Sequence, residues 1–156
     1  ASFIESETVS RLAKHQNIIG IKDATGDMEN LETLKTLCKE EIKTNNFSLF
    51  SGDDFSSLEF IANGGDGTIS VSSNIVPKIV SDICELVKKD YKTAKNLDDS
   101  LKDLNKYLFI ESNPIPVKWA LLKMGMIRSG IRLPLVELND KFKKPLEACL
   151  AELNLI

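Results

Sequence analysis

The sequence predicts an α/β fold in which three β-α units form a parallel sheet and an all-helical segment follows. Short apolar runs rich in β-branched residues alternate with amphipathic stretches up to about residue 90. Beyond that point, apolar residues recur at helical spacing alone. Three units are too few for a closed barrel, which needs eight. These patterns therefore leave open whether the sheet is an open, doubly wound one or a piece of a barrel.

The first strand is expected at residues 17–23, after a helix that ends near Lys14. Asp27 then stands at the N-cap of the next helix, where its carboxylate can accept hydrogen bonds from free backbone N–H groups. Apolar residues at intervals near 3.6 mark the buried side of this helix: Met28, Leu31, Leu34, Cys38 and Ile42. The first β-α unit is therefore well defined.

The next two units repeat the pattern. Residues 47–51 are expected to form the second strand, and Asp54 is expected to begin the following helix. Asn63-Gly64-Gly65 ends that helix, because these residues tolerate the left-handed conformation. Residues 68–71 are the predicted third strand. The helix after it carries an apolar stripe made of Ile75, Ile79, Ile83, Leu86 and Val87.

The last part of the chain is expected to be helical. Pro116 is suited to the start of a helix, and Gly125 stops the same helix. Three helices are predicted, at residues 93–109, 117–124 and 141–153. We therefore divide the chain into residues 1–90, with three β-α units, and residues 91–156, a helical region.

Composition narrows the classes of function. The formal charge of -3 and pI of about 5.3 give no electrostatic reason to expect nucleic-acid or membrane binding, and no apolar run approaches membrane-spanning length. Cys38, Cys84 and Cys149 are far apart and form neither a disulfide framework nor a zinc motif, which predicts reduced thiols and a cytoplasmic protein. The single histidine, His15, has neither a catalytic-triad nor a zinc pattern around it. Metal-free chemistry is therefore favoured.

Lys22 is the first candidate catalytic residue. It lies at the end of a predicted buried strand, where an unpaired ammonium is costly. One interpretation is a surface charge that pairs with Asp23 or Asp53. The other is a nucleophile, because desolvation favours the neutral amine that attacks a ketone. The carboxyl ends of parallel strands are where ligands bind in α/β folds. Position alone leaves both interpretations open.

Glycine and small polar residues follow the other two strands. Gly52 leaves room for a substrate or for the lysine to approach the backbone closely. Residues 68–74 bring exposed backbone and hydroxyl groups to the same edge of the sheet. The Gly64–Gly67 loop precedes a strand, so it lacks the strand–glycine–helix order of a nucleotide-binding sheet. The three strand ends together suit carbonyl chemistry on a small anionic keto acid.

Four ordered segments resemble the dihydrodipicolinate synthase family, and they span nearly the whole chain. The segments are IGIKDATGD at 19–27, LFSGDD at 49–54, GGDGTISV at 64–71 and ESNPIPVKWA at 111–120. The first three are similar to strands six, seven and eight of that family's barrel, and the fourth to its C-terminal helical region. The resemblance thus implies the C-terminal portion of a (β/α)8 TIM barrel followed by helices.

The resemblance also implies an activity. Family members are lyases that condense pyruvate with aspartate semialdehyde on the route to diaminopimelate and lysine, usually as homotetramers. By resemblance, Lys22 forms an imine with pyruvate, and the derived enamine attacks the aldehyde. The protonated imine is the electron sink, so neither a metal nor an organic cofactor is expected. Ile69 matches the position whose backbone contacts pyruvate, and Gly52 lies on the adjacent wall.

One departure from the family limits this expectation. The family's hydroxyl relay, its threonine pair and an arginine for the aldehyde belong to the barrel's first part, and neither Tyr91 nor Tyr107 matches the relay tyrosine. Three strands also leave two open sheet edges. We therefore expect a fragment that is inactive alone and needs an N-terminal half-barrel or another copy. The alternatives are a pyruvate aldolase of the N-acetylneuraminate lyase or 2-keto-3-deoxy sugar acid type, and a non-catalytic half-barrel that assembles with a full-length homologue.

Overall fold

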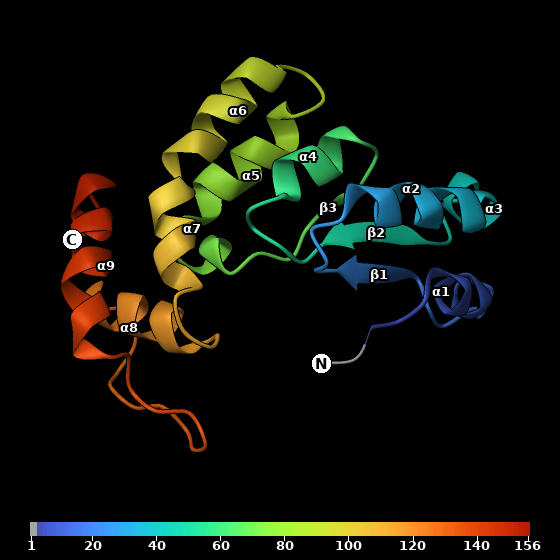
Figure 1. Cartoon of the computed structure of the whole chain (residues 1–156). Coiled ribbons are helices and arrows are strands. Elements are labelled where there is room, and N and C mark those ends of the chain that lie inside the picture. Colours follow the sequence, from blue (N-terminus) through green and yellow to red (C-terminus); the bar gives the residue numbers. More distant parts are fainter. Residues whose placement is uncertain (1–2) are drawn as a thin grey trace. The chain divides into compact units, whose positions relative to one another are not determined.

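A computed structural model describes residues 3–156 of the chain (Figure 1). The chain divides into two compact units, Ala1–Ser70 and Val71–Ile156. The first, which we call the sheet unit, contains a small parallel sheet with helices. The second, the helical unit, contains helices alone in its described residues. The predicted α/β class with a parallel sheet is confirmed.

The sheet has three parallel strands in the order β1-β2-β3: Gly20–Asp23, Ser48–Ser51 and Gly67–Thr68. Lys22 lies opposite Phe50, and Ser51 lies opposite Thr68. The predicted extent of the third strand, residues 68–71, is wrong. The chain leaves the ladder after Thr68 because it turns into the short 3-10 helix η1 (Ser72–Asn74). The Ile69 N–H continues the pairing with a hydrogen bond to the Ser51 carbonyl at 2.8 Å.

Four helices accompany the sheet: α1 (Ser6–Ala13), α2 (Met28–Leu37), α3 (Lys39–Lys43) and α4 (Ser57–Ala62). The single helix predicted through Ile42 is interrupted at Cys38, whose φ of -102° and ψ of 19° leave the helical region. The prediction that Asp54 begins a helix is also wrong. Asp53 instead accepts hydrogen bonds from the Ser56 N–H at 3.0 Å and the Ser56 hydroxyl at 2.6 Å, which closes a turn before α4.

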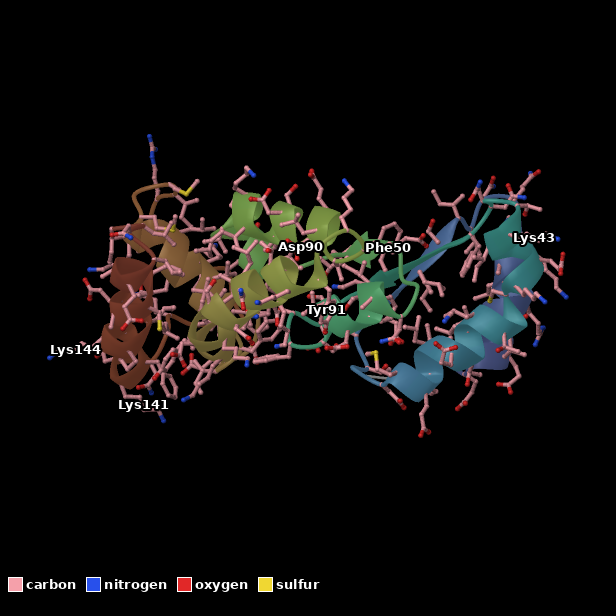
Figure 2. All side chains as sticks on the ribbon, turned by 90° about the horizontal axis from the view of Figure 1, so that it is seen from above. Lys43, Phe50, Asp90, Tyr91, Lys141 and Lys144 are labelled. Atoms are coloured by element: carbon pink, nitrogen blue, oxygen red, sulfur yellow. The ribbon has the colours of Figure 1, made fainter. Side chains whose placement is uncertain are left out.

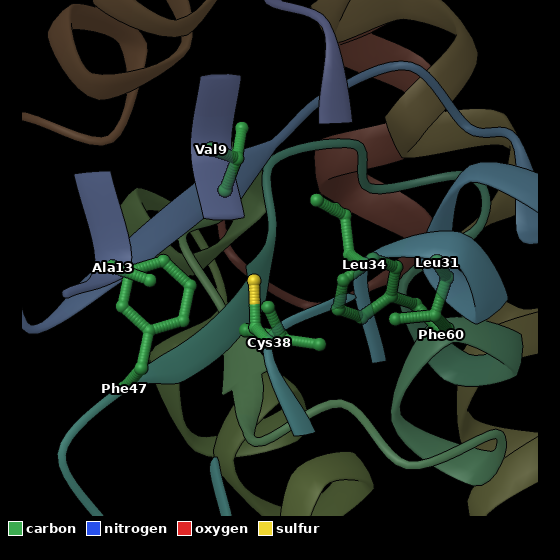
Figure 3. Packing of buried hydrophobic residues seen from close by; sticks show 8 residues of the cluster. Val9, Ala13, Leu31, Leu34, Cys38, Phe47 and Phe60 are labelled. Carbon is green, nitrogen blue, oxygen red and sulfur yellow. The ribbon is translucent and has the colours of Figure 1, made fainter. Parts of the chain in front are cut away.

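Buried apolar side chains pack together to form the core of the sheet unit (Figure 3). It joins buried side chains of the first helices, β2 and α4: Val9, Ala13, Leu31, Leu34, Cys38, Phe47, Leu49 and Phe60. Ile21 packs against this cluster, so strand alternation directs Lys22 and Phe50 to the opposite face. Phe50 is half-buried and Lys22 is exposed. Parallel strands are commonly buried on both faces, but in this unit taken by itself the face that carries Lys22 is exposed.

The N-cap of α2 confirms the prediction made for Asp27. Its Oδ1 accepts hydrogen bonds from the backbone N–H groups of Glu29 at 2.8 Å and Asn30 at 3.4 Å. We expect Asp27→Ala to lower the free energy of unfolding by about 1 kcal/mol. Asp27→Asn should change it by a few tenths at most, since asparagine caps equally well. Urea denaturation measures both, and equal losses in the two variants would contradict the capping role.

The helical unit contains α5 (Pro77–Leu86), α6 (Tyr91–Ser100), α7 (Lys102–Leu108), α8 (Ile115–Lys123) and α9 (Asp140–Glu152) after η1. Figure 1 shows α6 alongside α5, and α7 and α8 pack against α9. The single helix predicted over residues 93–109 is two helices. They meet at Leu101, whose N–H donates to the Asp98 carbonyl in a tighter turn than an α-helix makes. Gly125, with a φ of +72°, follows α8 as predicted.

The cysteines and the surface charges of this protein are those of an ordinary globular protein. Burial raises the pKa of the Cys38 and Cys149 thiols, so both stay protonated and act as small apolar side chains. Figure 2 shows Lys141 and Lys144 extending outward from α9, and Lys143 pairs with Asp140 at 2.7 Å on the same helix. Such exposed pairs add little stability. Within residues 3–156, no helix has the length and apolar character that crossing a membrane requires.

Candidate active site at the strand ends

Lys22 lies one residue before the end of β1. Its side chain is exposed, and in the described part of the chain its Nζ makes no hydrogen bond or salt bridge. Pairing with Asp23 or Asp53 is therefore not found. The expected desolvation of this lysine is also wrong, because Lys22 projects from the sheet face opposite the apolar core. The structure leaves a free primary amine at the strand end.

Gly52, the first residue after β2, lies directly beneath the aliphatic part of Lys22. A Cβ atom added at Gly52 would lie 2.5 Å from Lys22 Cε, 2.8 Å from Lys22 Cγ and 3.0 Å from the Cβ of Ala24. Real Cβ atoms do not approach other atoms so closely. Space, rather than an unusual backbone conformation, is what requires glycine here. The structure thus brings Lys22 and Gly52 together, with the lysine chain seated on the glycine.

Asp23 is a site residue whose connections the sequence reasoning missed. It is 7% exposed, and its Oδ1 accepts a hydrogen bond from the Thr25 N–H at 2.9 Å. Its Oδ2 accepts from Asn30 Nδ2 at 2.9 Å, and Asn30 Oδ1 in turn accepts from the Ser6 hydroxyl at 2.8 Å. Its backbone carbonyl accepts from the Gly52 N–H at 2.7 Å. The sequence signal for this role is an aspartate next to a strand-end lysine, which also fits an ion pair between the two.

Ile69 lies just past the end of β3 and its side chain is 51% exposed. Its N–H is hydrogen-bonded to the Ser51 carbonyl, and the Thr68 hydroxyl donates to the same carbonyl at 3.3 Å. The third predicted site residue is therefore at the same edge of the sheet as Lys22 and Gly52, because parallel strands end together. It lies on the far strand from Lys22, and no direct contact joins the two.

A hollow lies along the outer edge of β1. Residues of β1 and the loop after it, of the segment before α1, and of α1 and α2 line it: Phe3, Ile4, Val9, Ile21, Lys22, Asp23, Ala24, Thr25, Asn30 and Leu34. Within the described residues, β1 pairs with β2 alone, so its other edge offers free backbone groups. Residues 3–156 contain no cluster of three or more His, Cys, Asp or Glu side chains that could hold a metal ion. The site therefore offers an exposed amine whose aliphatic stem packs on Gly52.

Comparison with known proteins identifies the family. Residues 2–153 match the family described as the dihydrodipicolinate synthetase family. The chain belongs to this family. Relatives named 4-hydroxy-tetrahydrodipicolinate synthase are 47% identical over 98% of the chain in a Psychrobacter species and 45% identical over 94% in Pseudomonas aeruginosa. The chain covers 49% of each of these two relatives.

Solved structures of the dihydrodipicolinate synthetase family agree with this fold. The chain aligns with the Acinetobacter baumannii synthase, solved in complex with pyruvate, at a TM-score of 0.88 and 43% identity, covering 97% of this chain and 50% of that one. The Thermotoga maritima synthase gives a TM-score of 0.89 at 36% identity, covering 97% and 51%. The chain therefore spans about half the length of the family members it matches.

Proposed function

We propose that this chain supplies the imine-forming part of a 4-hydroxy-tetrahydrodipicolinate synthase. Such an enzyme is a lyase that condenses pyruvate with aspartate semialdehyde in diaminopimelate and lysine biosynthesis. The observation that carries the proposal is the amine of Lys22, which stands free on a stem seated on Gly52 at the strand end. Relatives that are 43–47% identical and bear this name support the choice of reaction.

We assign residues 1–90 to strands six to eight of a (β/α)8 barrel, with their helices, and residues 91–156 to the C-terminal helical region. The parallel order β1-β2-β3 supports the assignment, because sequential parallel neighbours are what a barrel segment contains. The likeness to synthase structures over 97% of the chain supports it as well.

In the proposed reaction, Lys22 Nζ attacks the ketone carbon of pyruvate, and loss of water gives a protonated imine. The imine withdraws electrons, so a methyl proton leaves and an enamine forms. The enamine carbon attacks the aldehyde, the amino group of the semialdehyde closes the ring, and Lys22 is released. No metal or organic cofactor takes part. The backbone of Ile69 is proposed to contact pyruvate, and Gly52 to form the adjacent wall.

The remaining part of the barrel is the proposed partner of this chain. Lys22 is exposed, and the outer edge of β1 is unpaired in the described residues, whereas an imine site needs walls that exclude water. We propose that an N-terminal half-barrel, or a homo-oligomer such as a tetramer, covers these groups in the cytoplasm. Without it the chain should not turn over. A non-catalytic half-barrel is the alternative if Lys22 never reacts.

The test is complementation. The chain is assayed alone and mixed with the portion of the Psychrobacter relative that lies outside the matched stretch, and semialdehyde-dependent consumption of pyruvate is measured. We expect activity in the mixture and none in the chain alone. Full activity of the chain alone would contradict the need for a partner. A mixture that associates but accepts only sugar-type aldehydes would favour an N-acetylneuraminate or 2-keto-3-deoxy sugar acid lyase.

A further inference from the structure

Asp23 is a buried residue whose two carboxylate oxygens both accept hydrogen bonds from neutral donors. The residue is 7% exposed, its Oδ1 accepts from the Thr25 N–H, and its Oδ2 accepts from the Asn30 amide. In the part of the chain that the structure describes, it forms no salt bridge. These hydrogen bonds join the end of β1 to the loop after it and to α2. Because Asp23 directly follows Lys22 in the strand, they also restrain the backbone that carries the lysine.

Asp23 makes hydrogen bonds to the loop after β1, to α2 and to Gly52, the residue on which the Lys22 side chain packs. Its side chain fixes the loop after β1 through Thr25, and it fixes α2 through Asn30. Its backbone carbonyl accepts the 2.7 Å hydrogen bond from the Gly52 N–H. Successive side chains of a strand point to opposite faces of the sheet. The Asp23 carboxylate therefore lies on the face opposite the one from which Lys22 projects.

We propose that Asp23 is a positioning residue for Lys22. It holds the end of β1 against Gly52, and it thereby fixes where the lysine stem rests and where the amine points. The proposal rests on the imine-forming function proposed above for Lys22. Asp23 does not touch the substrate in this role and transfers no proton.

The Lys22 side chain packs closely on Gly52, so small shifts of the end of β1 change the position of its amine. A single added carbon at Gly52 would lie 2.5 Å from Lys22 Cε, so the stem has no free space on that side. A shift of the β1 end relative to β2 would therefore carry the amine with it. Misplacing a reacting group by about 1 Å costs roughly a hundredfold in rate. Loss of the Asp23 side chain frees the loop that begins at Ala24 and removes the anchor to α2.

The experiment compares four variants in the complemented protein. Asp23→Ala removes the anchor, and Asp23→Asn keeps an oxygen for the Thr25 N–H while the Asn30 amide can rotate to accept from its Nδ2. Asn30→Ala removes one partner of the carboxylate. Ser6→Ala is the matched control. It removes the 2.8 Å hydrogen bond from the Ser6 hydroxyl to Asn30, at the far end of the same network. The readouts are the thermal midpoint and the rate of borohydride-trapped pyruvate adduct on Lys22, at saturating and at low pyruvate.

We expect Asp23→Ala to lower the trapping rate at saturating pyruvate by about ten- to a hundredfold. Asn30→Ala should give a smaller loss, which keeps the proposal testable if Asp23→Ala does not fold. Asp23→Asn should restore most of the rate, and Ser6→Ala should trap like the unchanged protein even where its thermal midpoint falls.

Three results would overturn the proposal. The first is a normal trapping rate in Asp23→Ala. The second is an equal loss in Ser6→Ala, which would indicate general destabilisation. The third is a loss in Asp23→Asn as large as in Asp23→Ala, which would assign the effect to charge. Absence of any adduct on Lys22 in the unchanged protein is a different outcome, because it overturns the proposed function together with this inference.

Discussion

Replacing Lys22 by alanine is expected to lower turnover of the complemented enzyme by at least about a thousandfold. The variant lacks the amine that we propose forms the imine, and no other group described at the strand ends can replace it. Lys22→Arg should be equally inactive, since a guanidinium stays protonated and does not condense with a ketone. Turnover is measured as semialdehyde-dependent consumption of pyruvate.

The matched control for Lys22 is Lys14→Ala. Lys14 is also an exposed lysine of the sheet unit, and it immediately follows α1, away from the carboxyl ends of the strands. We expect this variant to turn over within about twofold of the unchanged protein, as surface substitutions rarely matter. Substantial turnover in Lys22→Arg would contradict the assignment of the imine to Lys22.

Gly52→Ala is expected to lower turnover by about a hundredfold. The new methyl group would lie only 2.5 Å from Lys22 Cε and 2.8 Å from Lys22 Cγ, so the lysine stem must move away from Gly52. The stem is flexible and can move at modest cost in stability, on the order of 1–3 kcal/mol. Gly52→Ala should therefore lower the turnover rate strongly and the stability of the fold only slightly. Turnover and thermal unfolding are measured on the same preparation.

Gly67→Ala is the matched control for Gly52→Ala. Gly67 begins β3 and also has an ordinary φ, but its added Cβ would meet only the Phe50 ring, at 3.4 and 3.5 Å. Those distances are ordinary van der Waals contacts, so a small effect is expected. If Gly52→Ala retained turnover similar to that of Gly67→Ala, the seat of Lys22 on Gly52 would not matter for the reaction.

Local signals in the sequence predicted much of the fold. The carboxylate of Asp27 caps α2 as expected, and Gly64 and Gly125 adopt positive φ at the ends of their helices. These features depend on neighbours within a few residues, so sequence carries them. The parallel order of the strands follows from the alternation of strand and helix patterns.

Features that depend on distant contacts were not predicted. The helices break at Cys38 and Leu101 although the apolar stripes run through both positions. The position of Lys22 leaves open whether it is a surface charge or a desolvated amine, because strand periodicity does not reveal which sheet face is uncovered; in the structure Lys22 is exposed. The network from Asp23 to Asn30 and Ser6 joins residues up to 24 positions apart, so no local pattern marks it.

Mapping the covalent adduct tests the central claim most directly. The complemented protein is incubated with pyruvate, reduced with borohydride, digested and examined by mass spectrometry. We expect one reduced pyruvate adduct, on the peptide that contains Lys22, and none in Lys22→Arg. An adduct on another lysine, or turnover without any adduct on Lys22, would contradict the account.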